Sequence, residues 1–403
     1  MKKHNLFLLS AVLLCSSQNA FAYDMGNGVW KNLNEKYEQT TNNKSLISGM
    51  LSDRIYYNNT YGSENKKNEY SDTFIKTRLG VNVKLSDNFS FKTTAKFEKV
   101  NETSEAARRN QLPNGGGNRS FENHGAWLDE AVLGYDYKKF SALAGKMSPN
   151  FGDAWKSSNG IWVNEFAKKN YEHKEKLGLG LIGRAGDKKT IGEYVFGFST
   201  FTNDRKNFDN SSVTERDTVS KADGKVGDTR SLKSYVASMD VYYDFGKKEK
   251  LSYHGSYSNL AINERTAHDN AVPAKNNDQK SFAVNMNYDY PVCDKVLVSS
   301  FVEYVKINNL SGNIDKSSDI LTANITTYVK DFYFTIARAQ RRQKQINKVG
   351  VFEHINEVAV GYKFDNVNPV LKGLSLAAGY NQRETNPIAD RAFGLMLNHK
   401  LEF

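Results

Sequence analysis

Segments that alternate between apolar and polar residues recur along most of this chain. From residue 89 to residue 98, Phe, Thr and Ala occupy the odd positions, whereas Ser, Lys, Thr and Glu occupy the even positions. Successive side chains of a β-strand point to opposite faces, so each such segment predicts a strand with one apolar and one polar face.

The connectors between these segments alternate in length. Short connectors, such as 86–88 and 138–139, have the composition of tight turns. The long polar connectors are 101–125, 149–174, 204–230, 261–279, 309–317, 343–353 and 384–390. Transmembrane barrels show this arrangement, with short periplasmic turns and long extracellular loops. A soluble β-sandwich has no reason to place every long loop at one end.

The pattern predicts an all-β chain that forms an antiparallel transmembrane β-barrel of about 16 strands, with a range of about 14 to 18 left open. The predicted strands are 46–60, 71–85, 88–99, 126–137, 140–148, 175–185, 190–203, 231–245, 250–260, 280–290, 295–308, 318–329, 332–342, 354–364, 374–383 and 391–403. An even number places both ends on the periplasmic side and closes the barrel without an edge strand.

The N-terminus predicts export. Lys2 and Lys3 precede the short apolar stretch 6–14, and a small-x-small cleavage site follows at 20–22. We expect a signal peptide over 1–22, a periplasmic or lumenal extension over 23–44 and the barrel over 45–403. Removal of 1–22 takes away two lysines and lowers the net charge from +10 to +8. It also leaves Cys293 as the one cysteine, so no intrachain disulfide is expected.

Hydropathy excludes a helical membrane protein. Beyond the signal, the sequence has no apolar run of about 18 residues, and the mean hydropathy is −0.62. The chain carries 22 Tyr and 23 Phe but 6 Pro. Many of these aromatic residues lie near the ends of alternating segments, as in the girdles at the two membrane interfaces of a barrel.

The last eleven residues read F-G-L-M-L-N-H-K-L-E-F, from Phe393 to Phe403. The segment has one apolar and one mostly polar face, and it resembles the final strand of bacterial outer-membrane barrels, which commonly ends on Phe. The resemblance implies a location in the cell outer membrane. It also implies that Phe403 is the assembly signal that the barrel assembly machinery recognises.

A barrel of about 16 to 18 strands leaves an aqueous channel. With its signal, its strand-and-loop plan and Phe403, the chain resembles the Gram-negative general-diffusion porins. The resemblance implies a passive diffusion channel for ions and small hydrophilic solutes. It also implies a homotrimer, in contact with outer-membrane lipid and lipopolysaccharide. No cofactor, metal site or nucleic-acid partner is expected.

In these porins the third extracellular loop folds into the barrel, and the corresponding stretch here is 149–174. The segment 145–152, G-K-M-S-P-N-F-G, looks like a G-K-x-x-P-x-F-G pattern of several porin groups, whereas the family's P-E-F-G-G run is absent. The expected loop anchors are Phe151, Trp155 and Trp162. The expected acids of the pore constriction are Asp153 and Glu165.

The resemblance further implies a basic wall that faces the loop acids. The inward basic candidates are Lys76, Arg78, Lys92 and Lys96. Opposed charges would create a transverse field that orients permeating solutes. Because these clusters are basic and the mature charge is +8, the hypothesis is a modest anion preference. Lipopolysaccharide phosphates could meet Arg108, Arg109 and Arg119.

Other functions stay open at this point. A substrate-specific channel of about 18 strands, for phosphate or another anion, would need a concentrated basic ladder. An adhesin-like barrel would act through its long loops, chiefly 101–125 and 204–230. A barrel enzyme is not expected, since no G-x-S-x-G or H-E-x-x-H motif occurs. The best candidate for a catalytic triad is His254, with Ser252 or Ser256 on the same strand face and with Asp240 or Asp244 on the neighbouring strand.

Small residues give weak support to a trimer, because they allow close subunit packing. The candidates are Ala131, Ala142, Ala144, Ala337 and Ala339. Small residues beside the pore constriction would give the same pattern.

Overall fold

The computed structural model describes residues 46–100, 118–204, 211–214, 226–229, 231–262, 277–346, 348–385 and 388–403. The long strands are β1 (Ile47–Ser63), β2 (Tyr70–Lys84), β3 (Phe89–Lys99), β5 (His124–Tyr137), β6 (Phe140–Met147), β7 (Lys176–Asp187), β8 (Gly192–Asn203), β9 (Ser234–Gly246), β10 (Glu249–Leu260), β11 (Gln279–Cys293), β12 (Val296–Asn308), β13 (Lys316–Val329), β14 (Phe332–Gln345), β15 (Lys348–Lys363), β16 (Leu374–Thr385) and β17 (Ile388–Glu402). The short elements are β4 (Arg119–Ser120), the α-helices α3 (Ala154–Ser157) and α4 (Val163–Tyr171), and the 3-10 turns η1 (Lys66–Asn68), η3 (Leu310–Gly312) and η4 (Pro369–Leu371).

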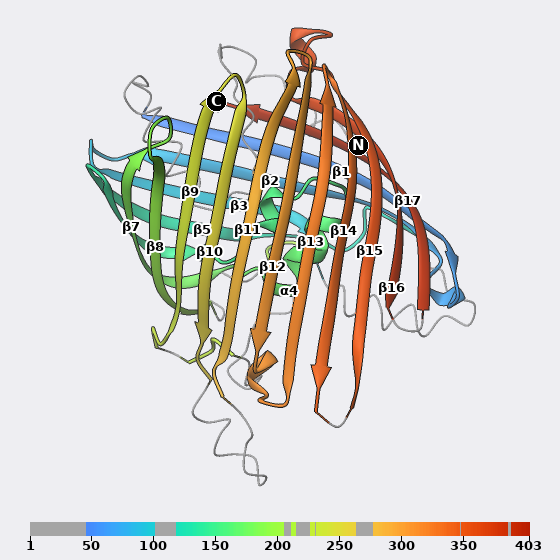
Figure 1. Cartoon of the computed structure of the whole chain (residues 1–403), viewed down its shortest axis with the longest axis horizontal. Helices are drawn as coiled ribbons and strands as arrows, with labels where there is room; N and C mark the ends of the chain where they lie inside the picture. The colour runs from blue at the N-terminus through green and yellow to red at the C-terminus, as the bar shows by residue number, and fades with distance from the viewer. Residues whose placement is uncertain are drawn as a thin grey trace, which may run out of the picture.

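These strands form one closed barrel (Figure 1). Each long strand pairs antiparallel with the next, and β17 pairs with β1 to close the wall, for example through Leu401 and Leu51. The sheet of the described residues has 17 strands, of which β4 is a two-residue parallel addition to β2, so sixteen strands make up the wall. The predicted antiparallel barrel of about 16 strands is confirmed.

The predicted loops at 343–353 and 384–390 are wrong. Strand β14 continues to Gln345 and β15 begins at Lys348, while β16 continues to Thr385 and β17 begins at Ile388. Their paired ends, such as Gln343 with Val351, are part of the sheet. Beyond the membrane both faces of a strand meet water, so the alternation of apolar and polar residues ends before the strand does.

The outer face carries a belt of exposed apolar side chains. Ile336 is 69% exposed, and Phe334 and Val358 lie beside it on the same face. Aromatic residues mark both edges of the belt: Tyr290, Phe332 and Tyr362 toward the short turns, and Phe282, Tyr304, Tyr380 and Phe393 toward the long loops. In water such a surface would be unfavourable, whereas lipid chains cover it in a membrane.

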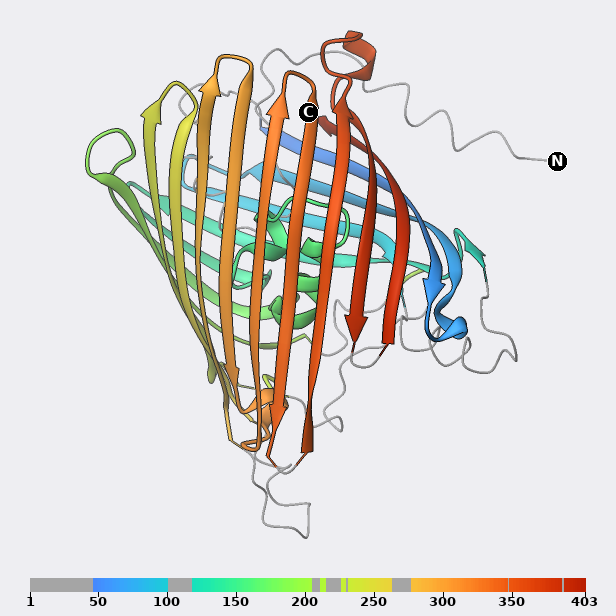
Figure 2. The same ribbon diagram turned by 45° about the vertical axis from the view of Figure 1, so that its right-hand side comes forward.

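Among the described residues, no helix is long and apolar enough to cross a membrane. The helices α3 and α4 instead lie inside the barrel, where both views show them enclosed by the wall (Figure 2). They belong to residues 149–174, whose apolar side chains pack against inward residues of the wall. This cluster includes Phe151, Val163, Phe166, Phe301, Val305 and Ile320.

Two of the alanines considered for subunit packing also belong to this interior cluster. Ala337 and Ala339 are buried under the loop, so they do not contribute to an outer contact surface. Ala142 and Ala144 alternate with the inward Leu143 on β6 and therefore lie on the outer face.

Candidate functional site

Two glutamates of the barrel wall hold the inward loop by its backbone. Glu357 on β15 accepts hydrogen bonds from the backbone N–H groups of Trp162 and Val163, each at 3.0 Å, and from that of Ile161. These groups lie at the N-terminal end of α4, where backbone donors lack partners within the helix and negative charge is favourable. The barrel wall therefore caps the helix from outside.

Glu303 on β12 has the same role for α3. Its carboxylate accepts from the backbone N–H of Ala154 at 2.9 Å and from that of Asp153. It also accepts from the Tyr171 hydroxyl, near the other end of the loop. One wall residue thus holds both ends of the inward segment.

The three expected loop anchors all contact the barrel interior. Phe151 is fully buried and stacks on His173, with 4.7 Å between the ring centroids. Trp155 donates from Nε1 to the Phe151 carbonyl at 3.2 Å. Trp162 donates from Nε1 to Asn58 Oδ1 of β1 at 3.2 Å. Burial, aided by the charge of Lys176, lowers the pKa of His173 to about 3, so this ring stays neutral as it stacks.

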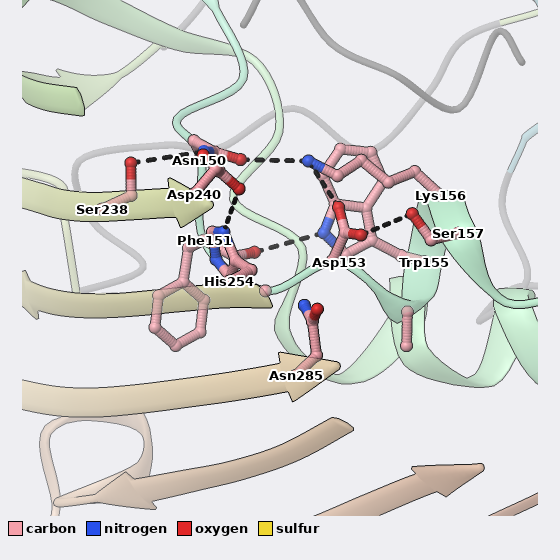
Figure 3. Close-up of polar contacts among 12 residues, drawn as sticks. Asn150, Phe151, Asp153, Trp155, Lys156, Ser157, Ser238, Asp240, His254 and Asn285 are labelled. Carbon is pink, nitrogen blue, oxygen red and sulfur yellow. Dashed lines mark hydrogen bonds and ion pairs between the residues drawn. The ribbon is translucent and has the colours of Figure 1, made fainter. Parts of the chain in front are cut away.

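A polar network fixes the start of the loop to β9 and β10 (Figure 3). Asn150 donates to Asp240 Oδ2 at 2.9 Å and to Ser238 at 3.2 Å, while its own oxygen accepts from Lys156 at 3.0 Å. Asp153 in turn pairs with Lys156 at 2.7 Å. This loop acid is therefore engaged within its own loop.

The candidate triad is brought together inside this network. His254 Nδ1 lies 2.7 Å from Asp240, and its Nε2 lies 2.9 Å from the Ser256 hydroxyl. Ser256 and His254 are each 4% exposed, and the backbone N–H of Gly152 donates to the Ser256 oxygen at 3.2 Å. The loop covers the would-be nucleophile, so the arrangement supports anchoring of the loop rather than catalysis.

On the other side of the loop, a recess with a mostly polar lining lies between the wall and α4. Its lining residues are Ser52, Arg54, Lys76, Arg78, Trp155, Asn164, Glu165 and Lys168. Lys76 bridges the gap, because its Nζ lies 2.7 Å from Glu165 Oε1. The lining brings four cationic side chains against one carboxylate.

The carboxylate of Glu165 is held in its charged form. Burial raises the pKa of Glu165, but the charges of Lys76 and Lys168 outweigh that effect and lower the pKa to about 2. For Lys168 the effects have the opposite sign. Burial lowers the pKa of Lys168, but the charges of Glu98 and Glu165 outweigh that effect and raise the pKa above its usual range. Both loop groups therefore stay ionised at neutral pH.

The predicted constriction residues do not all meet at this recess. Lys76, Arg78 and Glu165 line it together. Lys96 is 3% exposed and pairs with Asp129 of β5 at 2.5 Å. Lys92 lies two inward positions closer to the short turn between β2 and β3 than Lys96.

Arg54 and Lys168 are recess residues that sequence reasoning missed. Arg54 stands directly opposite Lys76 in the register of β1 and β2, which was the available signal. Lys168 follows Glu165 by one helical turn of α4, so a helix prediction within the loop would have paired them.

Arg119 does not serve the expected lipopolysaccharide role. Its guanidinium donates to Asp72 at 2.8 Å and 2.6 Å, and the residue is 9% exposed. The other two arginines of that expectation, Arg108 and Arg109, lie outside the described residues.

No protein-family model matches the sequence, and no curated protein matches it. Solved structures do match in fold. The outer membrane channel DcaP of Acinetobacter baumannii aligns with a TM-score of 0.50 at 15% identity, over 88% of this chain and 96% of that one. The chain has the fold of an outer-membrane channel of the porin type.

Two further structures align with lower scores. The outer membrane protein OpdK of Pseudomonas aeruginosa gives a TM-score of 0.48 at 10% identity, over 89% of this chain and 99% of that one. A trimer form of OmpT, an outer membrane protein of Vibrio cholerae, gives 0.49 at 10% identity, over 88% and 98%. The closed barrel and its aromatic-edged belt place this porin-type chain in the cell outer membrane.

Proposed function

We propose that the chain is an outer-membrane porin that lets ions and small hydrophilic solutes diffuse through a water-filled channel. The observation that supports it best is the recess between α4 and the first two strands. There, polar side chains from the wall and from the inward loop face one another at close range. A wall of sixteen strands leaves space for water, and the loop narrows that space to a site with a defined charge pattern.

The charge pattern supports a preference for anions. Arg54, Lys76, Arg78 and Lys168 line the recess with Glu165 as the one acid among its lining residues. Lys96 adds little to this field, because Asp129 neutralises it at 2.5 Å. The proposed constriction therefore consists of the four recess cations and Glu165, with Trp155 at its edge.

Single channels of the folded protein in planar bilayers test the function. We expect stepwise conductance in salt and a reversal potential of the anion-selective sign in a salt gradient. Lys168→Gln should reduce the selectivity, whereas the turn variant Lys138→Gln, which removes the same charge outside the channel, should not. Absence of conductance steps would refute the channel, and a clear cation preference would refute the selectivity.

The compactness of the recess supports a second candidate, a substrate-specific anion channel. Four cations converge on this recess, and a carboxylate or phosphate group of an organic anion could pair with them. Current that saturates with the concentration of one anion would favour this candidate. Current that rises linearly for all small anions would favour general diffusion.

We further propose a homotrimer in which the outer face of β1 and β2 is a subunit contact. Asp53 lies on this face, between the inward residues Ser52 and Arg54, and it accepts a hydrogen bond from Thr77 at 2.7 Å. His399 of β17 is its register partner on the other side. A carboxylate is unfavourable among lipid chains, so cover by a second subunit would explain its position between Leu51 and Ile55.

The proposed processing and assembly signals are residues 1–22, which lie outside the described residues, and Phe403. The backbone of Phe403 exchanges hydrogen bonds with Gly49 at 2.7 Å and 3.0 Å, which joins the last strand to the first. We propose that the barrel assembly machinery recognises this terminal strand. The loops of the adhesin alternative, 101–125 and 204–230, lie largely outside the described residues.

A further inference from the structure

Lys146, near the end of β6, is a buried cation that does not line the recess. Its side chain is 1% exposed, and its Nζ lies 3.0 Å from Asp204 Oδ2 and 3.3 Å from Glu175 Oε2. Glu175 directly precedes β7, and Asp204 directly follows β8. Both carboxylates are buried as well. The ends of three neighbouring strands therefore bring one amine and two acids together away from water.

The backbone has unusual conformations on both sides of this cluster. Lys146 follows the outer-face residue Ala144 by two positions, so simple alternation would place it on the outer face too. Between them, Gly145 has a φ of 134°, and a Cβ there would lie 2.1 Å from the Ala131 carbonyl oxygen. Glycine adopts this conformation readily, so it breaks the alternation and lets Lys146 turn inward. Glu175 has a φ of 58°, a left-handed conformation that is uncommon for residues with a side chain.

Lys146 is the charged partner of the Asp204 carboxylate. Within the described part of the chain, neither oxygen of this carboxylate takes part in a hydrogen bond. Glu175 differs, because its Oε1 accepts from Trp127 Nε1 at 3.3 Å. A buried carboxylate without hydrogen bonds is unfavourable while it is charged. A reaction that removes the charges of Lys146 and Asp204 would relieve this cost.

We propose that Lys146 and Asp204 condense to an intramolecular amide, with Glu175 as the group that transfers the protons. An amine held at about 3 Å from a carboxyl group has the separation at which fixed reactants gain most from proximity. A second carboxylate beside the amine can act in turn as base and as acid. The bond would join the end of β6, where the inward loop begins, to the end of β8. It would also give a role to the lysine of the G-K-x-x-P-x-F-G pattern at 145–152.

The reaction balances without another reactant. Glu175 passes a first proton from the Lys146 ammonium to one Asp204 oxygen, which leaves a neutral amine and a neutral carboxyl group. The Lys146 nitrogen attacks the Asp204 carboxyl carbon, and the C–N bond forms. Glu175 then passes a second proton from this nitrogen to the same oxygen, the C–O bond breaks, and water leaves. The products are the amide, one water molecule and Glu175 in its original ionised form.

The pair of Lys96 and Asp129 is a comparison within the same barrel. It is also buried, with 2.5 Å between Nζ and Oδ1. Among the described residues, however, Lys96 contacts a single carboxylate, so no second acid lies beside its amine to move the protons. We expect this pair to stay ionic.

The test is the mass of the unfolded protein after purification from outer membranes. The variant Lys146→Arg keeps the positive charge but cannot form the amide. The variant Glu175→Gln keeps both reacting groups but removes the proton transfer. The matched control is Lys176→Arg, since Lys176 lies at the same end of β7 and donates to Asn203 Oδ1 at 2.6 Å.

We expect the wild type and Lys176→Arg to be lighter than their sequences require by the mass of one water molecule. Lys146→Arg and Glu175→Gln should have their full masses. Protease digestion of the wild type should release one branched peptide that contains both Lys146 and Asp204. The Lys96 and Asp129 peptides should separate.

A wild type of full mass would overturn the proposal. Loss of water confined to a linear peptide around Asp204 would also overturn it, since it would indicate dehydration of the aspartate alone. Loss of water in Glu175→Gln would refute the role of Glu175. Because the mass is measured on unfolded chains, the result is independent of whether the protein conducts.

Discussion

The backbone N–H of Trp162 donates to the Glu357 carboxylate at 3.0 Å, across the lumen from an inward loop to the opposite wall. The same carboxylate accepts from two neighbouring backbone groups of the loop. One wall side chain therefore satisfies the backbone donors at the start of α4, which have no partner within the helix. The shape of the pore depends on this contact, since α4 carries Glu165 and Lys168 into the recess.

Replacement of Glu357 should loosen the loop. Glu357→Ala leaves three buried N–H groups without their acceptor, and each such group costs about 1–3 kcal/mol. We expect a lower melting temperature in detergent and larger, noisier single-channel conductance. Glu384→Gln, a change at a more exposed carboxylate of β16, is the control and should leave both unchanged. A quiet channel of normal conductance in Glu357→Ala would contradict the capping role.

The recess should keep its charge pattern down to low pH. The pKa of Glu165 is lowered to about 2. A lowered pKa means that the stabilising contribution of this group is complete above the ordinary value of about 4.5 and is lost as the pH falls through about 2. We therefore expect no step in ion selectivity between pH 8 and pH 5 from Glu165.

The measurement is the reversal potential as a function of pH, in the wild type and in Glu165→Gln. The variant should be more anion-selective at neutral pH, and the two curves should converge only as the pH falls toward about 2. Convergence near pH 4.5 would show that Lys76 and Lys168 do not hold the charge of Glu165.

The alternation of residues predicted the strands well where the two faces of the wall meet different media. For β3, the predicted segment 88–99 agrees with the observed Phe89–Lys99, because lipid on one side and water on the other enforce a period of two. The same rule fails beyond the membrane. There β14 and β15 meet water on both sides, so the sequence of their ends lacks the alternation of a strand and predicts a loop.

The candidate site was only partly predictable, because the sequence pattern assigns a face but not a partner. Lys76 and Lys96 share the inward face, yet only Lys76 lines the recess. The register between β3 and β5 shifts at Thr94 and Ala95. Beside this irregularity two consecutive acids, Asp129 and Glu130, are both buried, and Asp129 pairs with Lys96. Simple alternation would have sent one of the two acids outward.

The proposed subunit contact predicts sensitivity to bulk on one side of the barrel. Thr77→Trp on β2, beside Asp53, should convert the trimer to monomers, because a large side chain would separate the outer faces. Ile325→Trp on β13 places the same side chain on the opposite, lipid-facing wall, where Ile325 is 56% exposed, and should not. Migration on gels of unheated samples distinguishes the states. If both variants remained trimeric, the subunit contact would have to lie on another part of the outer face.

The terminal strand β17 should also position the inward loop, because its Gly394 lies directly against the Trp162 ring of that loop. A Cβ at Gly394 of β17 would lie 2.4 Å from the Trp162 ring, and one at Gly379 of β16 would lie 3.0 Å from it. The two glycines thus form a flat surface for the indole. We expect Gly394→Val to displace Trp162, which should shift its fluorescence emission to longer wavelength and change the single-channel conductance.

A double-mutant cycle identifies the cause. In a Trp162→Ala background the steric conflict is gone, so Gly394→Val should have a much smaller effect on conductance than in the wild type. Gly255→Val on β10 is the matched control, since a Cβ there meets nothing within 4 Å. Equal effects of Gly394→Val in both backgrounds would show that this glycine serves the strand alone, and that the last strand closes the barrel without shaping the pore.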